Sequence, residues 1–203
     1  MLDLNIPSST KKTGAREHEL IEQLVKYYHD QNFYVFPHSS LNISWGTVYV
    51  DLDLILVKNS LVSYVEVKSK NDHFSKAYDQ IENVRDFIDF AYIAAEKDLS
   101  HEALGSVGLV SIKDNQISLV HPPQRIINVP SFHSILSIKK KCLEQFFYDL
   151  GNTRLISKYK LAYRIFFESK VCNKQCLQEI ALCNRDCGDG CPLNDRNKIC
   201  FYL

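Results

Sequence analysis

The stretch TVYVDLDLILVKNSLVSYVEVKS, residues 47–69, decides the fold. It holds two β-rich runs, 47–57 and 61–69, separated by a short polar link at Lys58, Asn59 and Ser60. Two such runs joined by so short a link are typical of a β-hairpin. We therefore expect a hairpin in this part of the chain.

Charged residues interrupt these apolar strands on one face. Because side chains alternate along a strand, Asp51 and Asp53 share one face and the intervening leucines take the other. The same rule puts Glu66 and Lys68 together, and strand pairing brings the two pairs close. Carboxylates that converge in a half-buried site repel one another unless a cation lies among them. Oxygen ligands favour Mg²⁺ or Mn²⁺. A metal site is one interpretation, and a cross-strand ion pair on an exposed sheet face is the other.

The flanking sequence predicts an α/β fold class with a central mixed β-sheet flanked by helices. Helical spacing of apolar residues and short β-rich runs predict helices over 15–31 and 73–90, and strands over 33–36, 91–96, 105–110 and 116–121. We expect the first of these strands to end at Pro37. Residues 131–150 and 153–183 are expected to be mainly helical.

Composition is that of an ordinary globular protein. The chain has 203 residues, 45% of them hydrophobic and 24% charged, and its formal net charge is zero. This length is typical of one domain with a small appendage. Since no apolar run reaches the roughly 18 residues of a membrane span and the first residues lack a secretory pattern, we expect an intracellular, cytoplasmic protein without a membrane partner.

The last quarter of the chain differs from the rest. Residues 151–203 carry 9 Lys and Arg against 5 acidic residues, whereas residues 1–150 carry 15 against 19. This difference predicts a core domain over 1–150 and a basic, cysteine-rich helical C-terminal extension over 151–203. Tyr159 and Tyr163 alternate there with basic residues, which is typical of a nucleic-acid-binding helix and equally of a helix with an apolar core stripe.

Six of the seven cysteines lie close together in this extension. They are Cys172, Cys176, Cys183, Cys187, Cys191 and Cys200. Cys172 lies four residues before Cys176, and Cys183 four residues before Cys187, so in a helix each of these pairs offers two sulfurs on one side, as Zn²⁺ or an iron–sulfur cluster requires. An even number of cysteines also suits disulfides, and the spacing leaves both alternatives open.

The hairpin resembles a known nuclease motif. Asp53, twelve intervening residues and then Glu66-Val67-Lys68 resemble the motif of the PD-(D/E)XK, or restriction-endonuclease-like, superfamily. DLILVKNSLVSYVEVKS is most similar to its version in archaeal Holliday-junction resolvases. The resemblance covers about residues 14–121 and implies a restriction-endonuclease-like core, in agreement with the predicted order of elements.

The resemblance also implies a ligand set. Mg²⁺ or Mn²⁺ would be held by Asp53, Glu66 and the backbone carbonyl of Val67, and Lys68 would position or activate the attacking water. Asp51 is a second candidate for the aspartate.

Two helices are expected to contribute to this site by the same resemblance. Glu17 best matches the glutamate that the family carries on its first helix, with Glu19 and Glu22 as alternatives. On the next helix, Gln80 matches the residue that faces the site, with Lys76 one turn earlier.

The function implied is metal-dependent hydrolysis of DNA phosphodiester bonds in DNA repair, recombination or replication, in an archaeon or an archaeal virus. Many members of the family dimerise, so the analogy also implies a homodimer. A different class of function, a non-catalytic nucleic-acid-binding or assembly module on the same fold, is the alternative hypothesis.

Overall fold

The computed structural model describes residues 14–41, 51–59, 61–70, 72–96, 105–127, 131–146, 157–163, 166 and 177–178. By backbone packing the chain divides into two units, Met1–Ser39 with Asp51–Ile126 and Ser40–Val50 with Ile127–Leu203. All six tail cysteines lie outside the described residues.

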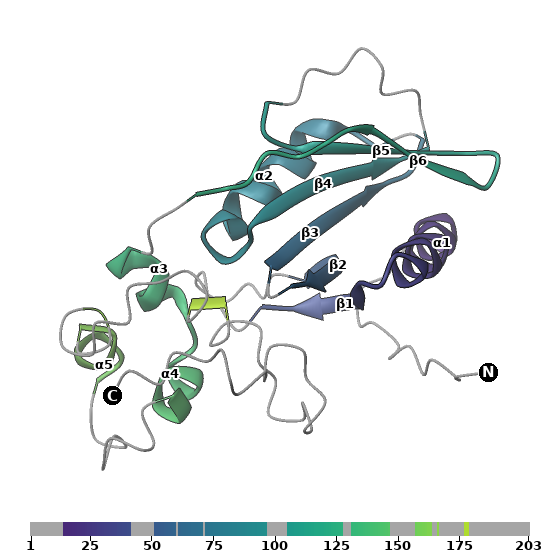
Figure 1. The fold of residues 1–203 in the computed structure, drawn as a ribbon. Helices are drawn as coiled ribbons and strands as arrows, with labels where there is room; N and C mark the ends of the chain where they lie inside the picture. The colour runs from purple at the N-terminus through teal and green to yellow at the C-terminus, as the bar shows by residue number, and fades with distance from the viewer. Residues whose placement is uncertain are drawn as a thin grey trace. The chain divides into compact units, whose positions relative to one another are not determined.

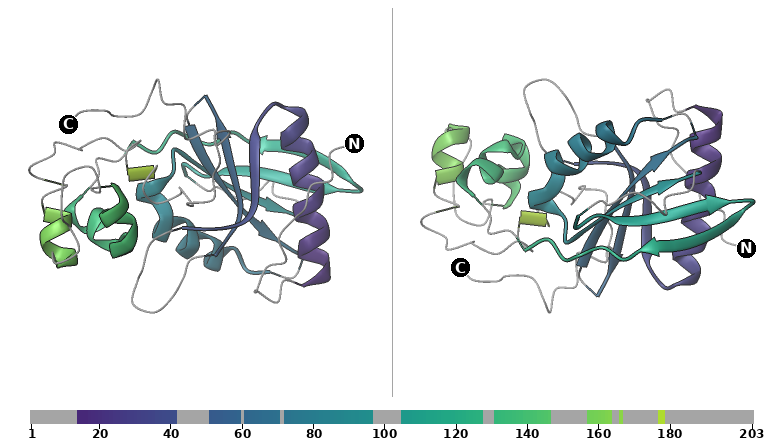
Figure 2. Two further views of the ribbon diagram at one scale, coloured as in Figure 1. Left: turned by 90° about the horizontal axis from the view of Figure 1, so that it is seen from below. Right: turned by 90° about the horizontal axis from the view of Figure 1, so that it is seen from above.

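The first unit is α/β, as predicted. Its elements are α1 (Ala15–Asp30), β1 (Tyr34–Ser40), β2 (Asp51–Lys58), β3 (Leu61–Lys68), α2 (Phe74–Val84), a 3₁₀ turn (Arg85–Phe87), β4 (Phe90–Ala95), β5 (Gly108–Lys113) and β6 (Gln116–His121). The six strands form one mixed sheet in the order β1-β2-β3-β4-β5-β6. β2 and β3 are antiparallel, β3, β4 and β5 are parallel, and β6 returns antiparallel. Helices α1 and α2 lie on opposite faces of this sheet (Figure 1, Figure 2).

The predicted hairpin is confirmed. β2 and β3 pair from Leu54 opposite Val65 to Lys58 opposite Leu61, which leaves a two-residue link. Asn59 in that link has a φ of 52°, a left-handed conformation that asparagine tolerates better than most residues. A second tight hairpin joins β5 to β6, where Asp114 and Asn115 both have positive φ, as a type I′ turn requires.

One face of the sheet forms the main core with α1. Leu20, Ile21 and Leu24 of α1 are fully buried against side chains of β2 and β3 that alternate along each strand, Leu54, Leu56, Val65 and Val67. Burial of such side chains stabilises the fold by about 1.5–3 kcal/mol each. Asp53 and Glu66 therefore point to the opposite face, where α2 packs.

Three predicted boundaries are wrong, each because of tertiary context. β1 continues through Pro37 to Ser40; it is an edge strand, where a proline need not donate a hydrogen bond. β5 spans Gly108–Lys113 rather than 105–110, since Gly105 lies in a turn with a φ of 58°.

The third wrong boundary is the end of the second helix. α2 ends at Val84 rather than at residue 90, and Ile88 already has an extended backbone. The next residue, Asp89, donates its backbone N–H to the Val62 carbonyl and accepts the Val62 N–H with its side chain at 3.0 Å. These bonds to β3 hold the chain in the extended form that begins β4.

The described part of the second unit is helical. It contains α3 (Phe132–Ser137), α4 (Lys140–Phe146) and α5 (Lys158–Tyr163). Ser131 caps α3 by accepting the backbone N–H of Ser134 at 3.1 Å. The ring of Phe132 packs edge-on against Tyr159, with centroids 5.2 Å apart, which joins α3 to α5.

Candidate active site

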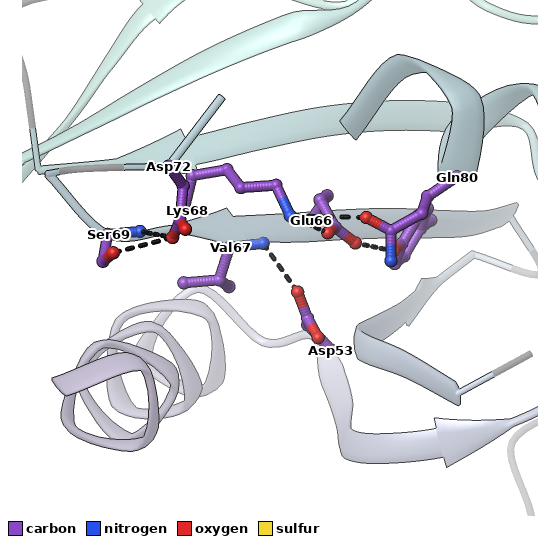
Figure 3. Close-up of polar contacts among 8 residues, drawn as sticks. Asp53, Glu66, Val67, Lys68, Ser69, Asp72 and Gln80 are labelled. Atoms are coloured by element: carbon purple, nitrogen blue, oxygen red, sulfur yellow. Dashed lines mark hydrogen bonds and ion pairs between the residues drawn. The ribbon is translucent and has the colours of Figure 1, made fainter. Parts of the chain in front are cut away.

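Polar side chains from two neighbouring strands gather on the α2 face of the sheet. Tyr64, Glu66 and Lys68 follow one another at alternate positions along β3, so they share a face. Asp53 comes from β2, one residue beyond the pair Leu54–Val65. Figure 3 shows Asp53, Glu66 and Lys68 with Gln80, which reaches toward them from α2. The structure thus brings together Asp53, Glu66, Lys68 and Gln80.

The Asp53 carboxylate is buried and bonded to the backbone of the next strand. It is 3% exposed, and its Oδ2 accepts the Val67 N–H at 2.9 Å (Figure 3). This contact lies beyond the last backbone pair of the hairpin, so the aspartate side chain satisfies a donor that the ladder leaves. Asp51 begins the same strand, and its side chain lies outside the described set.

Both oxygens of Glu66 have partners. Oε1 accepts from the Lys68 ammonium group, and Oε2 accepts from the Tyr64 hydroxyl. The side chain is only 1% exposed. Burial and the nearby Asp53 carboxylate raise the pKa of Glu66 to about 7, against the opposing effects of Lys68 and Tyr64. Because this pKa lies close to physiological pH, Glu66 can gain or lose a proton there.

Lys68 bridges the two elements that meet at the site. Its ammonium group bonds Glu66 and also donates to Oε1 of Gln80 on α2 at 3.3 Å (Figure 3). Because the lysine has two acceptors, the ammonium is directed along the sheet face toward α2. The Lys68 side chain is only 13% exposed, so these contacts fix its position.

Tyr64 is a site residue that the sequence reasoning missed. It is fully buried, and burial together with the charges of Glu66, Asp53 and Glu17 raises its pKa well above the ordinary value for tyrosine. The signal was present, since Tyr64 precedes Glu66 by two residues and so shares its face. The phenol donates to the carboxylate and thereby fixes its orientation.

Glu17 lies in the first turn of α1. Its charge acts on Tyr64, which places it in the electrostatic environment of the cluster. The two alternatives are each more than half exposed and have other partners: Glu19 pairs with Arg16 at 2.6 Å and Glu22 with His18 at 3.3 Å.

Arg16 also anchors this turn of α1 to the sheet. Its guanidinium pairs with Glu96, which directly follows β4, through a 2.9 Å bond from Nε.

After β3, Asp72 closes a turn by accepting the backbone N–H and the hydroxyl of Ser69, both at 2.7 Å (Figure 3). The pKa of Asp72 is lowered mainly by its bonds with Ser69 and further by the charge of Lys68.

The donor set suits a hard divalent cation that also binds phosphate. Within the described residues, no three His, Cys, Asp or Glu side chains form a metal-binding group by themselves. Mg²⁺ is commonly bound by only one or two carboxylates, with waters and substrate phosphates completing the shell. Asp53 and Glu66 meet this requirement, and the amine of Lys68 lies beside them.

No family model matches, and no curated protein matches. Among solved structures, the chain is similar to a protein of unknown function from Silicibacter pomeroyi, with 10% identity and a TM-score of 0.46, over 70% of this chain and 99% of that one. In the part of the chain that the structure describes, no helix is both long and apolar enough to cross a membrane.

Proposed function

We propose that this protein is a metal-dependent nuclease that hydrolyses DNA phosphodiester bonds. The observation that carries the proposal is the convergence of Asp53, Glu66 and Lys68 on one buried sheet face. Two carboxylates share one ammonium there, and burial together with the neighbouring Asp53 carboxylate raises the pKa of Glu66. A divalent ion would relieve this repulsion, which is why the cluster supports metal binding.

Each residue has a role that follows from its chemistry. Asp53, Glu66 and the Val67 carbonyl would hold Mg²⁺ or Mn²⁺, and Glu17 would complete the set from α1. When bound, such an ion lowers the pKa of a coordinated water and polarises the phosphoryl oxygens. Lys68 donates to the attacking water or to the charged phosphoryl oxygens, which are negative in the transition state. Gln80 orients the ammonium group through the 3.3 Å bond.

Lys68 can leave Glu66 without losing every partner. In the structure its ammonium group bonds Glu66, and Gln80 offers a second acceptor on the adjacent helix. If Glu66 held a cation, Lys68 would therefore keep Gln80 as an acceptor. Gln80 is in this way a positioning residue that acts through Lys68.

One observation favours the alternative, a nucleic-acid-binding or assembly module without turnover. Both oxygens of Glu66 are already bonded, to Lys68 and Tyr64, so the cluster is satisfied without a metal. A binding module needs no more than this, whereas an enzyme requires the cluster to open for a cation. The two functions therefore differ in their response to metal and to loss of the lysine.

The test compares the wild-type chain with Glu66→Gln and Lys68→Met on end-labelled single-stranded, duplex and four-way DNA. Reactions contain Mg²⁺, Mn²⁺ or a chelator. We expect cleavage by the wild type with metal, and a loss of about a hundredfold or more in each variant, because each removes a group that stabilises the transition state. DNA binding in chelator should persist.

Glu82→Gln is the matched control. Glu82 is a largely exposed glutamate on α2 that pairs with Arg85, so its variant should cleave like the wild type. Cleavage that survives in Glu66→Gln, or that ignores the chelator, would contradict the nuclease proposal. DNA binding with no cleavage under any of these conditions would favour the alternative.

A further inference from the structure

Helix α5 presents two aromatic rings on an exposed face. Tyr159 and Tyr163 are four residues apart, so they lie on the same side of the helix, and they are 58% and 46% exposed. The buried side of α5 is formed by Leu161 and Ala162 instead. The sequence allowed either a nucleic-acid-binding helix or a helix with an apolar core stripe, and the exposed Tyr159 and Tyr163 do not belong to such a stripe.

The ring of Tyr159 is held in place although more than half of the side chain is exposed. It packs edge-on against Phe132 of α3, and Phe132 also contacts the ring of Phe166, with centroids 6.1 Å apart. A ring that is already fixed loses little conformational entropy when a ligand stacks on it. Tyr159 is thus suited to serve as a stacking platform.

The surrounding helices carry an excess of positive charge. The described residues of 131–146 and 157–163 include five lysines and one acidic residue: Lys139, Lys140, Lys141, Lys158, Lys160 and Glu144. The acidic residue already pairs with Lys140 at 3.1 Å. Lys160 lies between the two tyrosines in sequence and is exposed. This charge favours a polyanion as the ligand.

We propose that the exposed face of α5, formed by Tyr159, Lys160 and Tyr163, binds a single-stranded segment of DNA. The choice of DNA rests on the proposed function. Exposed aromatic rings stack on unpaired bases, whose faces a duplex hides, while lysines bind the backbone phosphates. A surface for duplex DNA alone would need the cations but not the rings. The second unit would thus hold a single-stranded region of the substrate.

The test measures binding of the full chain to a fluorescent 20-nucleotide single strand by anisotropy, in chelator so that nothing is cleaved. We expect Tyr159→Ala and Tyr163→Ala each to weaken binding about five- to a hundredfold, since stacking on one ring has this effect. Tyr159→Phe should bind like the wild type because it keeps the ring and its contact with Phe132. Lys160→Gln should lower the slope of log affinity against log salt by about 0.7.

Controls come from the first unit. Tyr34 is 59% exposed on β1, so Tyr34→Ala matches Tyr159→Ala in lost exposed ring, and Lys113→Gln matches Lys160→Gln on an exposed lysine. Both should bind normally. Circular dichroism and thermal unfolding of each variant report folding, and Tyr159→Phe separates loss of the ring from loss of the hydroxyl.

Several results would overturn the proposal. They are equal binding by Tyr159→Ala and the wild type, tighter binding to the matched duplex or to single-stranded RNA, and a preference for anionic lipid vesicles. None of these results bears on cleavage, because binding is measured without metal. Conversely, if cleavage by Glu66→Gln contradicts the nuclease proposal, binding of the single strand by α5 can still be tested in chelator.

Discussion

At the scale of single residues, the candidate site is a problem of charge burial. Asp53 and Glu66 are 3% and 1% exposed, and an isolated buried carboxylate is strongly unfavourable. Each therefore has a donor: the Val67 N–H for Asp53, and Lys68 with Tyr64 for Glu66. These bonds do not cancel the cost for Glu66, since its pKa remains raised.

This raised pKa predicts how stability depends on pH. Between pH 4.5, the ordinary value for the carboxyl, and about 7, folded Glu66 keeps a proton that the unfolded chain has released. The folded state binds more protons in this window, so the contribution of Glu66 to stability falls as pH rises through it and is then constant. Glu66→Gln removes this dependence. In chelator, urea denaturation should show the variant gaining stability relative to wild type from pH 5 to pH 8.

Glu82→Gln is the control for this pH series, because Glu82 is an exposed carboxylate on α2 whose partner, Arg85, stays charged over this range. Its difference from wild type should stay nearly constant over the same range. A constant difference for Glu66→Gln as well would show that Glu66 ionises normally in the fold.

Tyr64→Phe tests the phenol. The variant keeps the buried ring and removes the hydroxyl that donates to Glu66. A hydrogen bond to a charged group contributes about 1.5–3 kcal/mol, so we expect a loss of this size in the free energy of unfolding at pH 8, measured in urea. Tyr28→Phe is the matched control, since Tyr28 is also buried but lies among Tyr27, Phe33 and Tyr92. Equal effects of the two variants would remove any special role for Tyr64.

At the scale of elements, the site depends on how α1 and α2 are attached to the sheet. α1 packs its apolar side against β2 and β3, and the Arg16–Glu96 pair anchors its first turn to the residue that follows β4. Glu17 lies in that turn. α2 is the next element after β3 and ends at Val84, shortly before Asp89 bonds to Val62, and its Gln80 faces Lys68.

We expect Arg16→Ala to loosen the first turn of α1 without unfolding the protein. Arg16 is about half exposed, and such surface pairs contribute little to stability. Amide hydrogen exchange should become faster at residues 18–20 while global stability changes little. Arg85→Ala removes a comparable exposed pair from α2 and should leave exchange in α1 unchanged. Unchanged exchange in Arg16→Ala would show that core packing alone holds this turn.

At the scale of the whole molecule, a bound cation would add to the stability of the fold. A ligand that binds only the folded state stabilises it by about 2.7 kcal/mol when its concentration is a hundred times the Kd. We therefore expect Mg²⁺ or Mn²⁺ to raise the free energy of unfolding of the wild type relative to chelator. Asp53→Asn should abolish this increase, and Asp30→Asn should retain it. An equal increase in all three proteins would place the metal elsewhere.

Much of the first unit was predictable because its signals are local. The alternation of Leu54 and Leu56 with Asp53 sets which face of β2 is apolar, and the helical spacing of Leu20 and Leu24 predicts α1. Because alternation and helical spacing act within a few residues, they need no knowledge of the rest of the chain. The pairing of Glu66 with Lys68 on one face follows from the same rule.

Tertiary contacts decided the remainder. Pro37 remains in a strand because β1 is at the edge of the sheet, and α2 ends at Val84 because the chain bonds to β3 at Val62. The exposure of Tyr159 depends on which side of α5 is buried, which its spacing alone does not specify.

The sequence by itself determined the hairpin, the apolar faces and the acidic residues that share a strand face, since side-chain period is a property of the local backbone. Only the tertiary structure decided that Gln80 meets Lys68, that Tyr64 holds Glu66, and that both carboxylates are buried. The physical reason is that desolvation and hydrogen bonding depend on neighbours brought together by folding, not on neighbours in the chain.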